Sequence, residues 1–105
     1  MEQKNKMKNI DYSNIDELRT GFINFLKTHR KDVARPGNRA GNALFIARHN
    51  IGISLETTMK ASDGIEQAQR LLEEFWIKTN SRKDPKRNAS VYAHDLRLLK
   101  EYIES

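Results

Sequence analysis

Residues 62–79 read SDGIEQAQRLLEEFWIKT and contain the clearest amphipathic pattern in the chain. The apolar residues that share one face at helical spacing are Ile65, Ala68, Leu72, Phe75 and Trp76. Ser62 or Asp63 can cap this helix, because each side-chain oxygen can accept a hydrogen bond from a free backbone N–H group. We therefore predict a helix that runs through Thr79.

Similar spacing occurs in the preceding half of the chain. Ser13, followed three residues later by Asp16, resembles a capping box and predicts a first helix that ends near His29. The segment RKDVARPGNRAGN, residues 30–42, contains breakers of helical periodicity and predicts a loop, with a second helix from about residue 39 to residue 50. Residues 54–60 predict a short helical turn.

The last third of the chain predicts a basic connection and a final helix. The connection is SRKDPKRN, residues 81–88, and the helix runs from about Ala89 to the end of the chain. No stretch alternates with a period of two for long enough to form a strand. We expect an all-α fold, a single small bundle of four to five helices over residues 11–105, preceded by a disordered arm at residues 1–10.

Composition favours a folded globular protein. Of 105 residues, 37% are hydrophobic and 31% are charged, which is too apolar for general disorder. The chain lacks cysteine, which fits a reducing compartment, and no apolar run approaches the roughly 18 residues that span a bilayer. We expect a cytoplasmic protein with no membrane contact; its oligomeric state is left open.

The net charge of +5 is concentrated in two places. The first basic cluster, opposed by Asp32, consists of Lys27, Arg30, Lys31, Arg35, Arg39 and Arg48. The second basic cluster, opposed by Asp84, consists of Lys78, Arg82, Lys83, Lys86 and Arg87. Basic surfaces attract polyanions, although they also serve solubility.

The sequence offers no catalytic or metal-binding pattern. His29, His49 and His94 fall in different predicted helices, without the i, i+4 pair of a zinc-binding helix. Ser90 and His94 lie one helical turn apart, but Asp95 points about 100° away from His94 and cannot orient it as a triad requires. We expect a non-enzymatic protein with no cofactor, no metal and no catalytic residues.

Three features outside the periodic pattern are candidates for binding or special packing. The segment from Gly37 to Asn42 either forms a plain loop or brings backbone amides, Arg35 and Arg39 to a phosphate. Phe45 falls on the polar side of its helix, where it either stacks on a partner or packs beneath the N-terminal arm. Asp95 falls inside an apolar stripe, so we predict an ion pair with an arginine or a cap on loop amides.

The tract LLEEFWIKTNSRKDPKRNASVYAHDLRLLKEYIE, residues 71–104, has an aromatic helix, a basic link and a pattern of Tyr-x3-Leu-x2-apolar-x2-aromatic-apolar. The positions that fit the final pattern are Tyr92, Leu96, Leu99, Tyr102 and Ile103. Over about residues 65–104 the chain resembles the SAM-like core-binding domain at the N-terminus of tyrosine recombinases and phage integrases. Asn88 stands where that family usually has Thr, and residues 1–60 fall outside the resemblance.

The resemblance implies DNA clamping by basic residues near helix ends. In this chain they are Arg82, Lys83, Lys86 and Arg87. It does not imply recombination, because the recombinase catalytic domain is far larger than this chain.

We therefore expect a non-enzymatic helical module that binds DNA, as a duplex, mainly through backbone phosphates. The candidate contacts are Arg35, Arg39, Phe45, Arg82, Lys83, Lys86 and Arg87. The alternative is a protein-interaction or inhibitor module, including one of phage or mobile-element origin, that docks its basic surface on an acidic protein partner.

Overall fold

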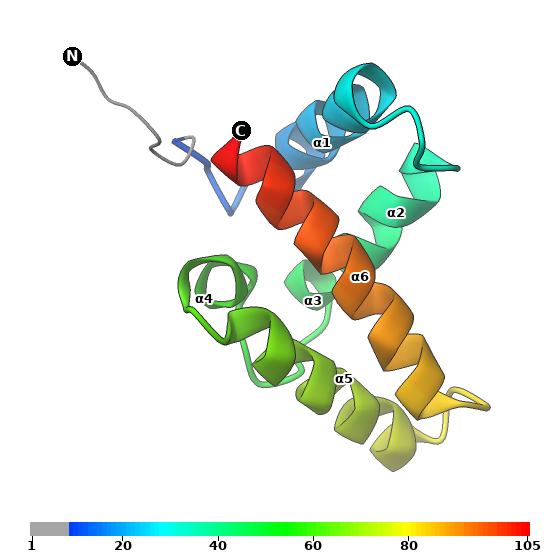
Figure 1. The fold of residues 1–105 in the computed structure, drawn as a ribbon. Helices are drawn as coiled ribbons and strands as arrows, with labels where there is room; N and C mark the ends of the chain where they lie inside the picture. Colours follow the sequence, from blue (N-terminus) through cyan, green and yellow to red (C-terminus); the bar gives the residue numbers. More distant parts are fainter. Residues whose placement is uncertain (1–8) are drawn as a thin grey trace.

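The computed structural model describes residues 9–105, and within that range it contains helices and connecting segments but no strand (Figure 1). The helices are α1 (Ile15–His29), α2 (Pro36–Ala43), α3 (Phe45–Arg48), α4 (Leu55–Lys60), α5 (Gly64–Thr79) and α6 (Pro85–Glu104). The predicted all-α bundle is confirmed. The count exceeds four to five because the second expected helix is divided at Leu44.

The predicted arm, residues 1–10, lies largely outside the described residues. Its last residue, Ile10, is partly buried and packs against the hydrophobic core. The described chain is therefore attached to the bundle from at least Ile10 onward, one residue earlier than the predicted domain boundary.

Two helices begin earlier than predicted, and both begin at a proline. The second helix starts at Pro36 rather than at residue 39, and the last starts at Pro85 rather than at Ala89. Proline suits the first helical position because its fixed φ is helical and the N–H it lacks would have no partner there. Asp84 then caps α6 by accepting a hydrogen bond from the backbone N–H of Arg87 at 3.2 Å.

The first helix is capped by Asn14, not by the predicted Ser13. The Asn14 side chain accepts from the N–H of Glu17 and donates to the Glu17 carboxylate, while the N–H of Asn14 binds the carbonyl of Asp11, so a side-chain cap forms without the reciprocal backbone bond of a capping box. Ser13 instead uses its N–H and hydroxyl to bind Asp11. The predicted capping box is therefore wrong, and the cap lies one residue later.

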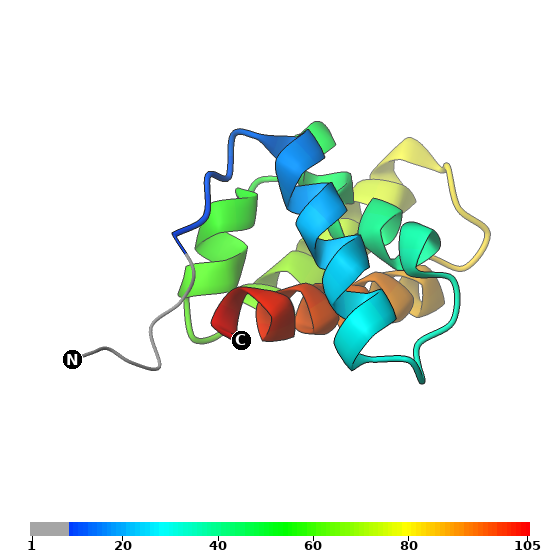
Figure 2. The ribbon, with the colours of Figure 1, turned by 90° about the horizontal axis from the view of Figure 1, so that it is seen from above.

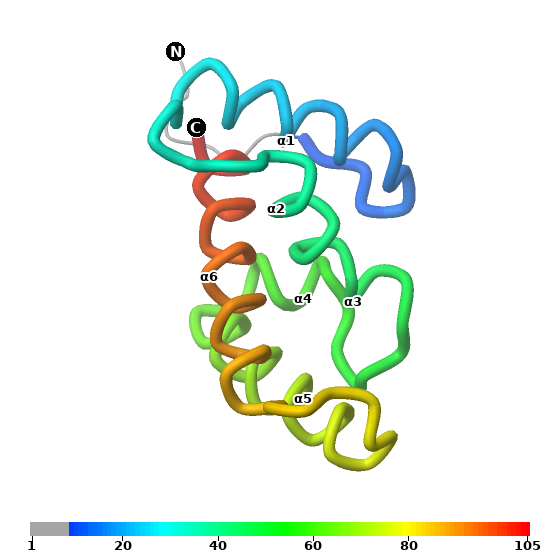
Figure 3. Tube along the Cα trace, turned by 90° about the vertical axis from the view of Figure 1, so that its right-hand side faces the viewer, coloured from blue at the N-terminus to red at the C-terminus, as the bar shows by residue number. Residues whose placement is uncertain are grey.

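The long helix α6 contacts α5, α2 and α1 (Figures 1 and 2). Figure 3 shows α1 across one end of α6 and α5 beside its other end. Five of the buried apolar residues of α6 recur at intervals of three or four: Ala89, Ala93, Leu96, Leu99 and Ile103. Helix α6 packs on α5, whose buried face includes Leu72, which is fully enclosed, and Trp76, which is 1% exposed. The pattern that predicted α5 is therefore the face that packs on α6.

Gly64 permits the sharp junction between α4 and α5. A Cβ atom at this position would overlap the carbonyl oxygen of Thr58. Gly64 also donates its N–H to Ala61 O at 3.1 Å, which closes the turn. Backbone atoms on the α4 side cannot move away as a flexible side chain can, so the junction requires glycine.

Replacing Gly64 by Ala is expected to destabilise the protein, although Ala is the better helix former. The matched control is Gly41→Ala in α2, where no atom lies within 4 Å of the added Cβ. That change should stabilise by about 0.5–1 kcal/mol through helix propensity. Thermal melts followed by circular dichroism measure both, and a stabilised Gly64→Ala variant would contradict the close packing at this junction.

Candidate functional site

Asp95 is fully buried on α6 and is held by two residues of α2. Asn42 donates from Nδ2 to Asp95 Oδ2 at 2.8 Å. The Nε atom of Arg39 lies 3.5 Å from Asp95 Oδ1, close enough for an ion pair, but neither atom has a hydrogen-bond partner. The predicted pairing of Asp95 with an arginine is present in the structure. Arg39, predicted to bind phosphate, is thus engaged inside the fold.

Burial raises the pKa of Asp95 above its usual value of 3.8. The hydrogen bond from Asn42 and the charges of Arg39 and His94 act in the opposite direction, but they do not cancel the loss of hydration. The folded state therefore holds the Asp95 proton more tightly than the unfolded state does.

Arg82 is also largely engaged by the fold. Its guanidinium carbon lies 4.6 Å from the centre of the Trp76 ring and 5.5 Å from that of Tyr92. Its Nη2 donates to the Tyr92 hydroxyl at 3.1 Å. These contacts hold the connection after α5 against the aromatic core. The guanidinium of Arg82 therefore interacts with the protein itself and positions this connection.

Phe45 is partly buried, and the rings that it meets among the described residues belong to α5, to α6 and to His49. Its ring meets Tyr92 edge to face at 5.7 Å and Trp76 at 5.5 Å, and it stacks on His49 at 4.0 Å. Packing beneath the arm stays an expectation. The arm itself lies outside the described residues, except for Asn9 and Ile10.

Four of the predicted contact residues keep their charged groups at the surface. Arg35, Lys83, Lys86 and Arg87 are exposed. Arg35 precedes α2 with a φ of 53°, an uncommon backbone conformation for a residue with a side chain. Of the seven predicted site residues, four are exposed basic residues, two are arginines that contact other side chains of the fold, and one is a packed aromatic ring.

The exposed face of α6 is basic over its first three turns. Its exposed residues from 86 to 97 are Lys86, Arg87, Ser90, Val91, His94 and Arg97. The sequence of this stretch contains one acid, Asp95, which is buried. In Figure 3 the connection between α1 and α2 lies near the C-terminal end of α6, whereas the basic stretch begins at the other end of this helix.

The opposite end of α6 is closer to neutral, because Arg30 binds two carboxylates there. Arg30 donates to both oxygens of Asp32, at 2.9 and 3.0 Å, and to Glu101 at 2.6 Å. These hydrogen bonds raise the pKa of Arg30 and lower that of Asp32. The first basic cluster is therefore weaker as an anion-binding surface than its sequence indicates.

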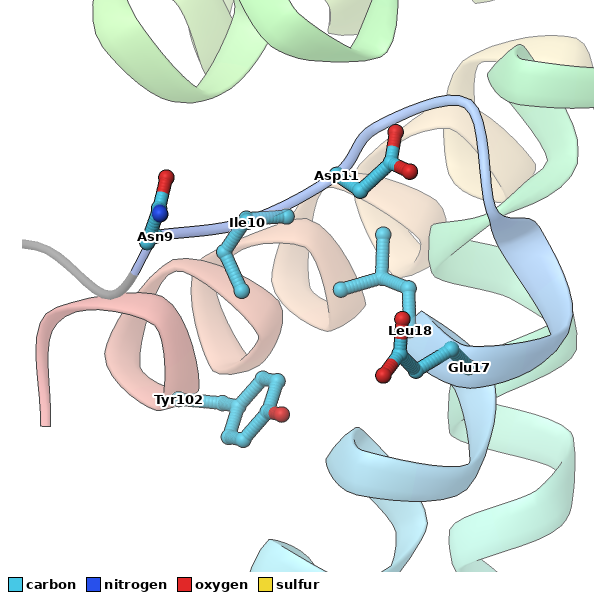
Figure 4. Close-up of a pocket in the computed structure, with 6 residues that line it drawn as sticks. All are labelled: Asn9, Ile10, Asp11, Glu17, Leu18 and Tyr102. Atoms are coloured by element: carbon cyan, nitrogen blue, oxygen red, sulfur yellow. The ribbon is translucent and has the colours of Figure 1, made fainter.

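A hollow of about 230 Å³ near the start of the described chain is unsuited to anions (Figure 4). Asp11 and Glu17 both contribute carboxylates to its wall, together with the partly buried Tyr102. Ser13 lowers the pKa of Asp11 by hydrogen bonding, so this carboxylate is held in its charged form. The basic surface of α6 is the better candidate for a site.

Among residues 9–105, no three His, Asp or Glu side chains gather as a metal site. Within the same range, no helix has the length and apolar character to cross a membrane. Comparisons of the chain with protein-family models, curated proteins and solved structures found no match.

Sequence reasoning missed three residues that the fold places at or near this surface. Arg97 extends the basic face of α6, and its spacing from Lys86, Ser90 and His94 is a signal that helical periodicity offers. His49 lies four residues after its partner Phe45, a spacing that helical periodicity also offers, whereas the partner of Asn42, Asp95, lies on a helix distant in sequence.

The pKa of Asp95 predicts how stability depends on pH. A group whose pKa is raised by folding contributes most to the unfolding free energy at pH values below its unfolded pKa. That contribution is lost as pH rises through its pKa in the folded state. The unfolding free energy of the wild type relative to Asp95→Asn should therefore fall as pH rises from below the usual Asp pKa of 3.8 to above the raised pKa of the folded state. Urea unfolding at several pH values measures this difference.

Asp32→Asn is the matched control, because the pKa of the exposed Asp32 is lowered by Arg30. Its contribution is present above the unfolded pKa and is lost as pH falls. The unfolding free energy of the wild type relative to Asp32→Asn should therefore rise with pH, which is opposite to the trend expected for Asp95→Asn. Slopes of the same sign for both variants would contradict the different environments of the two carboxylates.

Proposed function

We propose that this protein is a non-enzymatic helical module that binds duplex DNA mainly through its backbone phosphates. The observation that carries the proposal is the exposed face of α6 over residues 86–97, on which Lys86, Arg87 and Arg97 are accompanied by no exposed acid; the exposed acids of α6, Glu101 and Glu104, lie beyond this stretch. Lys83 extends this basic surface into the preceding connection. Lysine and arginine side chains that neutralise phosphates release counterions, and this release supplies most of the affinity of such proteins.

Two carboxylates near this surface, those of Asp84 and Asp95, accept hydrogen bonds within the fold. Asp84, the acid of the second basic cluster, accepts the N–H of Arg87 as the cap of α6. Asp95 is buried against Arg39 and Asn42. Asp84 is exposed and keeps its negative charge beside Arg87, but the basic side chains of residues 83–97 outnumber it, which favours a polyanionic partner.

The second basic cluster is well positioned for phosphate contacts because its backbone is fixed. Arg82 holds the connection to Trp76 and Tyr92, and Asp84 fixes the first turn of α6. Lys83, Lys86 and Arg87 thus extend from an ordered segment, which lowers the entropic cost of binding. The resemblance to recombinase core-binding domains stays a prediction, as do the cytoplasmic location and an origin in a mobile element.

The second candidate function is docking on an acidic protein partner. Val91 favours it, because this side chain is 40% exposed in the middle of the basic face of α6. A protein partner would bury this apolar side chain on binding, whereas a phosphate contact would leave it in water. Phosphate binding does not require Val91.

Changing Lys83, Lys86 and Arg87 together to Gln is expected to weaken duplex binding. The slope of log K against log salt should become shallower by about 0.9 for each phosphate contact that is lost. Fluorescence anisotropy with a labelled duplex at several salt concentrations measures the slope. Arg39 and Arg82 are left unchanged because both stabilise the fold.

The control for this series is Lys60→Gln, which removes a charge on α4 whose Nζ lies 2.7 Å from Glu56. Its salt slope should equal that of the wild type, as should its affinity. Undetectable DNA binding by the wild-type protein at low salt would overturn the proposed function.

Val91→Lys separates the two candidate functions. An added positive charge at this exposed position should maintain or raise duplex affinity, since it places another basic side chain beside the phosphates. A protein partner that packs on Val91 would instead lose an apolar contact. Duplex titration at fixed low salt measures the change, and a marked loss of DNA affinity by a folded variant would show that Val91 itself contacts the DNA.

A further inference from the structure

A second hollow, of about 590 Å³, lies where α3, the end of α5 and the second basic cluster meet. Its walls include Phe45, His49, Phe75 and Arg82. Thr79 and Ser81 add hydroxyl groups at its edge, where their oxygens lie 2.7 Å apart. No residue that lines this hollow carries a negative charge.

The aromatic rings form a continuous layer from the core to the surface. Trp76 is buried, Phe45 is tilted against it, and Phe75 meets the edge of Phe45 at 6.1 Å. The ring of His49 stacks on Phe45 with an interplanar angle of 15°. Since His49 is an exposed residue, the layer ends in a flat ring at the surface.

A hydrogen bond holds the His49 ring in this position. Its Nδ1 lies 3.1 Å from the carbonyl oxygen of Phe45. A carbonyl can only accept, so Nδ1 carries the proton and donates in this contact. The stacked orientation is thus fixed before any partner arrives, which reduces the entropic cost of adding another ring.

One basic side chain lines the hollow, and two more belong to its neighbouring segments. Arg82 lines it, and the exposed Lys78 and Lys83 belong to the segments that form its edge. Flat aromatic surfaces beside basic side chains are how proteins bind single-stranded nucleic acid, because bases stack while phosphates pair with the cations.

We propose that this hollow binds an unpaired nucleobase, stacked against His49 and Phe75 with its phosphate beside Arg82 and Lys83. This inference rests on the proposed DNA binding and specifies the DNA: a duplex with a single-stranded end or gap next to it. The basic face of α6 then binds the paired region, and the hollow binds the first free base.

The test compares a blunt duplex with the same duplex carrying a short thymidine overhang, and with one whose overhang is abasic. The overhang should raise affinity about fivefold or more, as expected for at least one stacked base. The abasic overhang retains the phosphates, so its affinity should match that of the blunt duplex apart from a small electrostatic gain.

His49→Ala should abolish the gain from thymidine while leaving blunt-duplex affinity unchanged. The matched control is His29→Ala, because His29 also stacks on a phenylalanine of its own turn, Phe25, at 5.2 Å. His29 does not line the hollow, so this variant should keep the full gain. Ser81→Glu, at an exposed position, provides a second variant that repels the phosphate without removing a ring.

Equal affinity for the thymidine and abasic overhangs would overturn the inference, and so would a full gain in folded His49→Ala and Ser81→Glu variants. In either case salt-dependent binding of the blunt duplex would leave the proposed function standing. Binding of the thymidine overhang without blunt-duplex binding would support the hollow and overturn the duplex proposal.

Discussion

The burial of Asp95 in the middle of α6 is the interaction on which the rest of the arrangement depends. A carboxylate in the core is costly unless other groups replace its hydration, and Arg39 and Asn42 of α2 supply those groups. The need for these partners fixes α2 against α6. The same burial removes the single acid of residues 86–97 from the surface and leaves the outer face of α6 basic.

Much of the fold could be predicted from helical periodicity, because the apolar residues of α5 and α6 recur with the spacing that packing requires. The stripe that contains Leu72 and Trp76 is buried as expected, and the out-of-pattern position of Asp95 correctly predicted a buried ion pair. The helix starts at Pro36 and Pro85 were missed. A proline is a breaker within a helix and a favourable first residue, and local sequence alone does not separate the two cases.

The candidate site was less predictable, because a count of basic residues does not show which of them the fold uses. Arg30, Arg39 and Arg82 all contributed to the predicted basic clusters, yet each is bound to carboxylates or aromatic rings. Glu101 and Asp95, the partners of Arg30 and Arg39 on α6, lie far away in sequence, whereas Asp32, Trp76 and Tyr92 are near, yet composition does not show which of these pairs the fold makes. The exposed lysines were easier to predict, since a solvated side chain needs no partner.

The engaged arginines are nevertheless part of the binding surface, because they determine its geometry. Arg82 stacks on Trp76, and Trp76 in turn lies against Phe45, which stacks on His49. One side of this layer supports the connection that carries Lys83, and its other end is the exposed ring of His49. Loss of Arg82 would therefore disturb both the phosphate contacts and the stacking surface. The basic face of α6 and the hollow beside His49 can therefore be tested separately only with exposed residues that belong to one of them, such as Arg87 or His49.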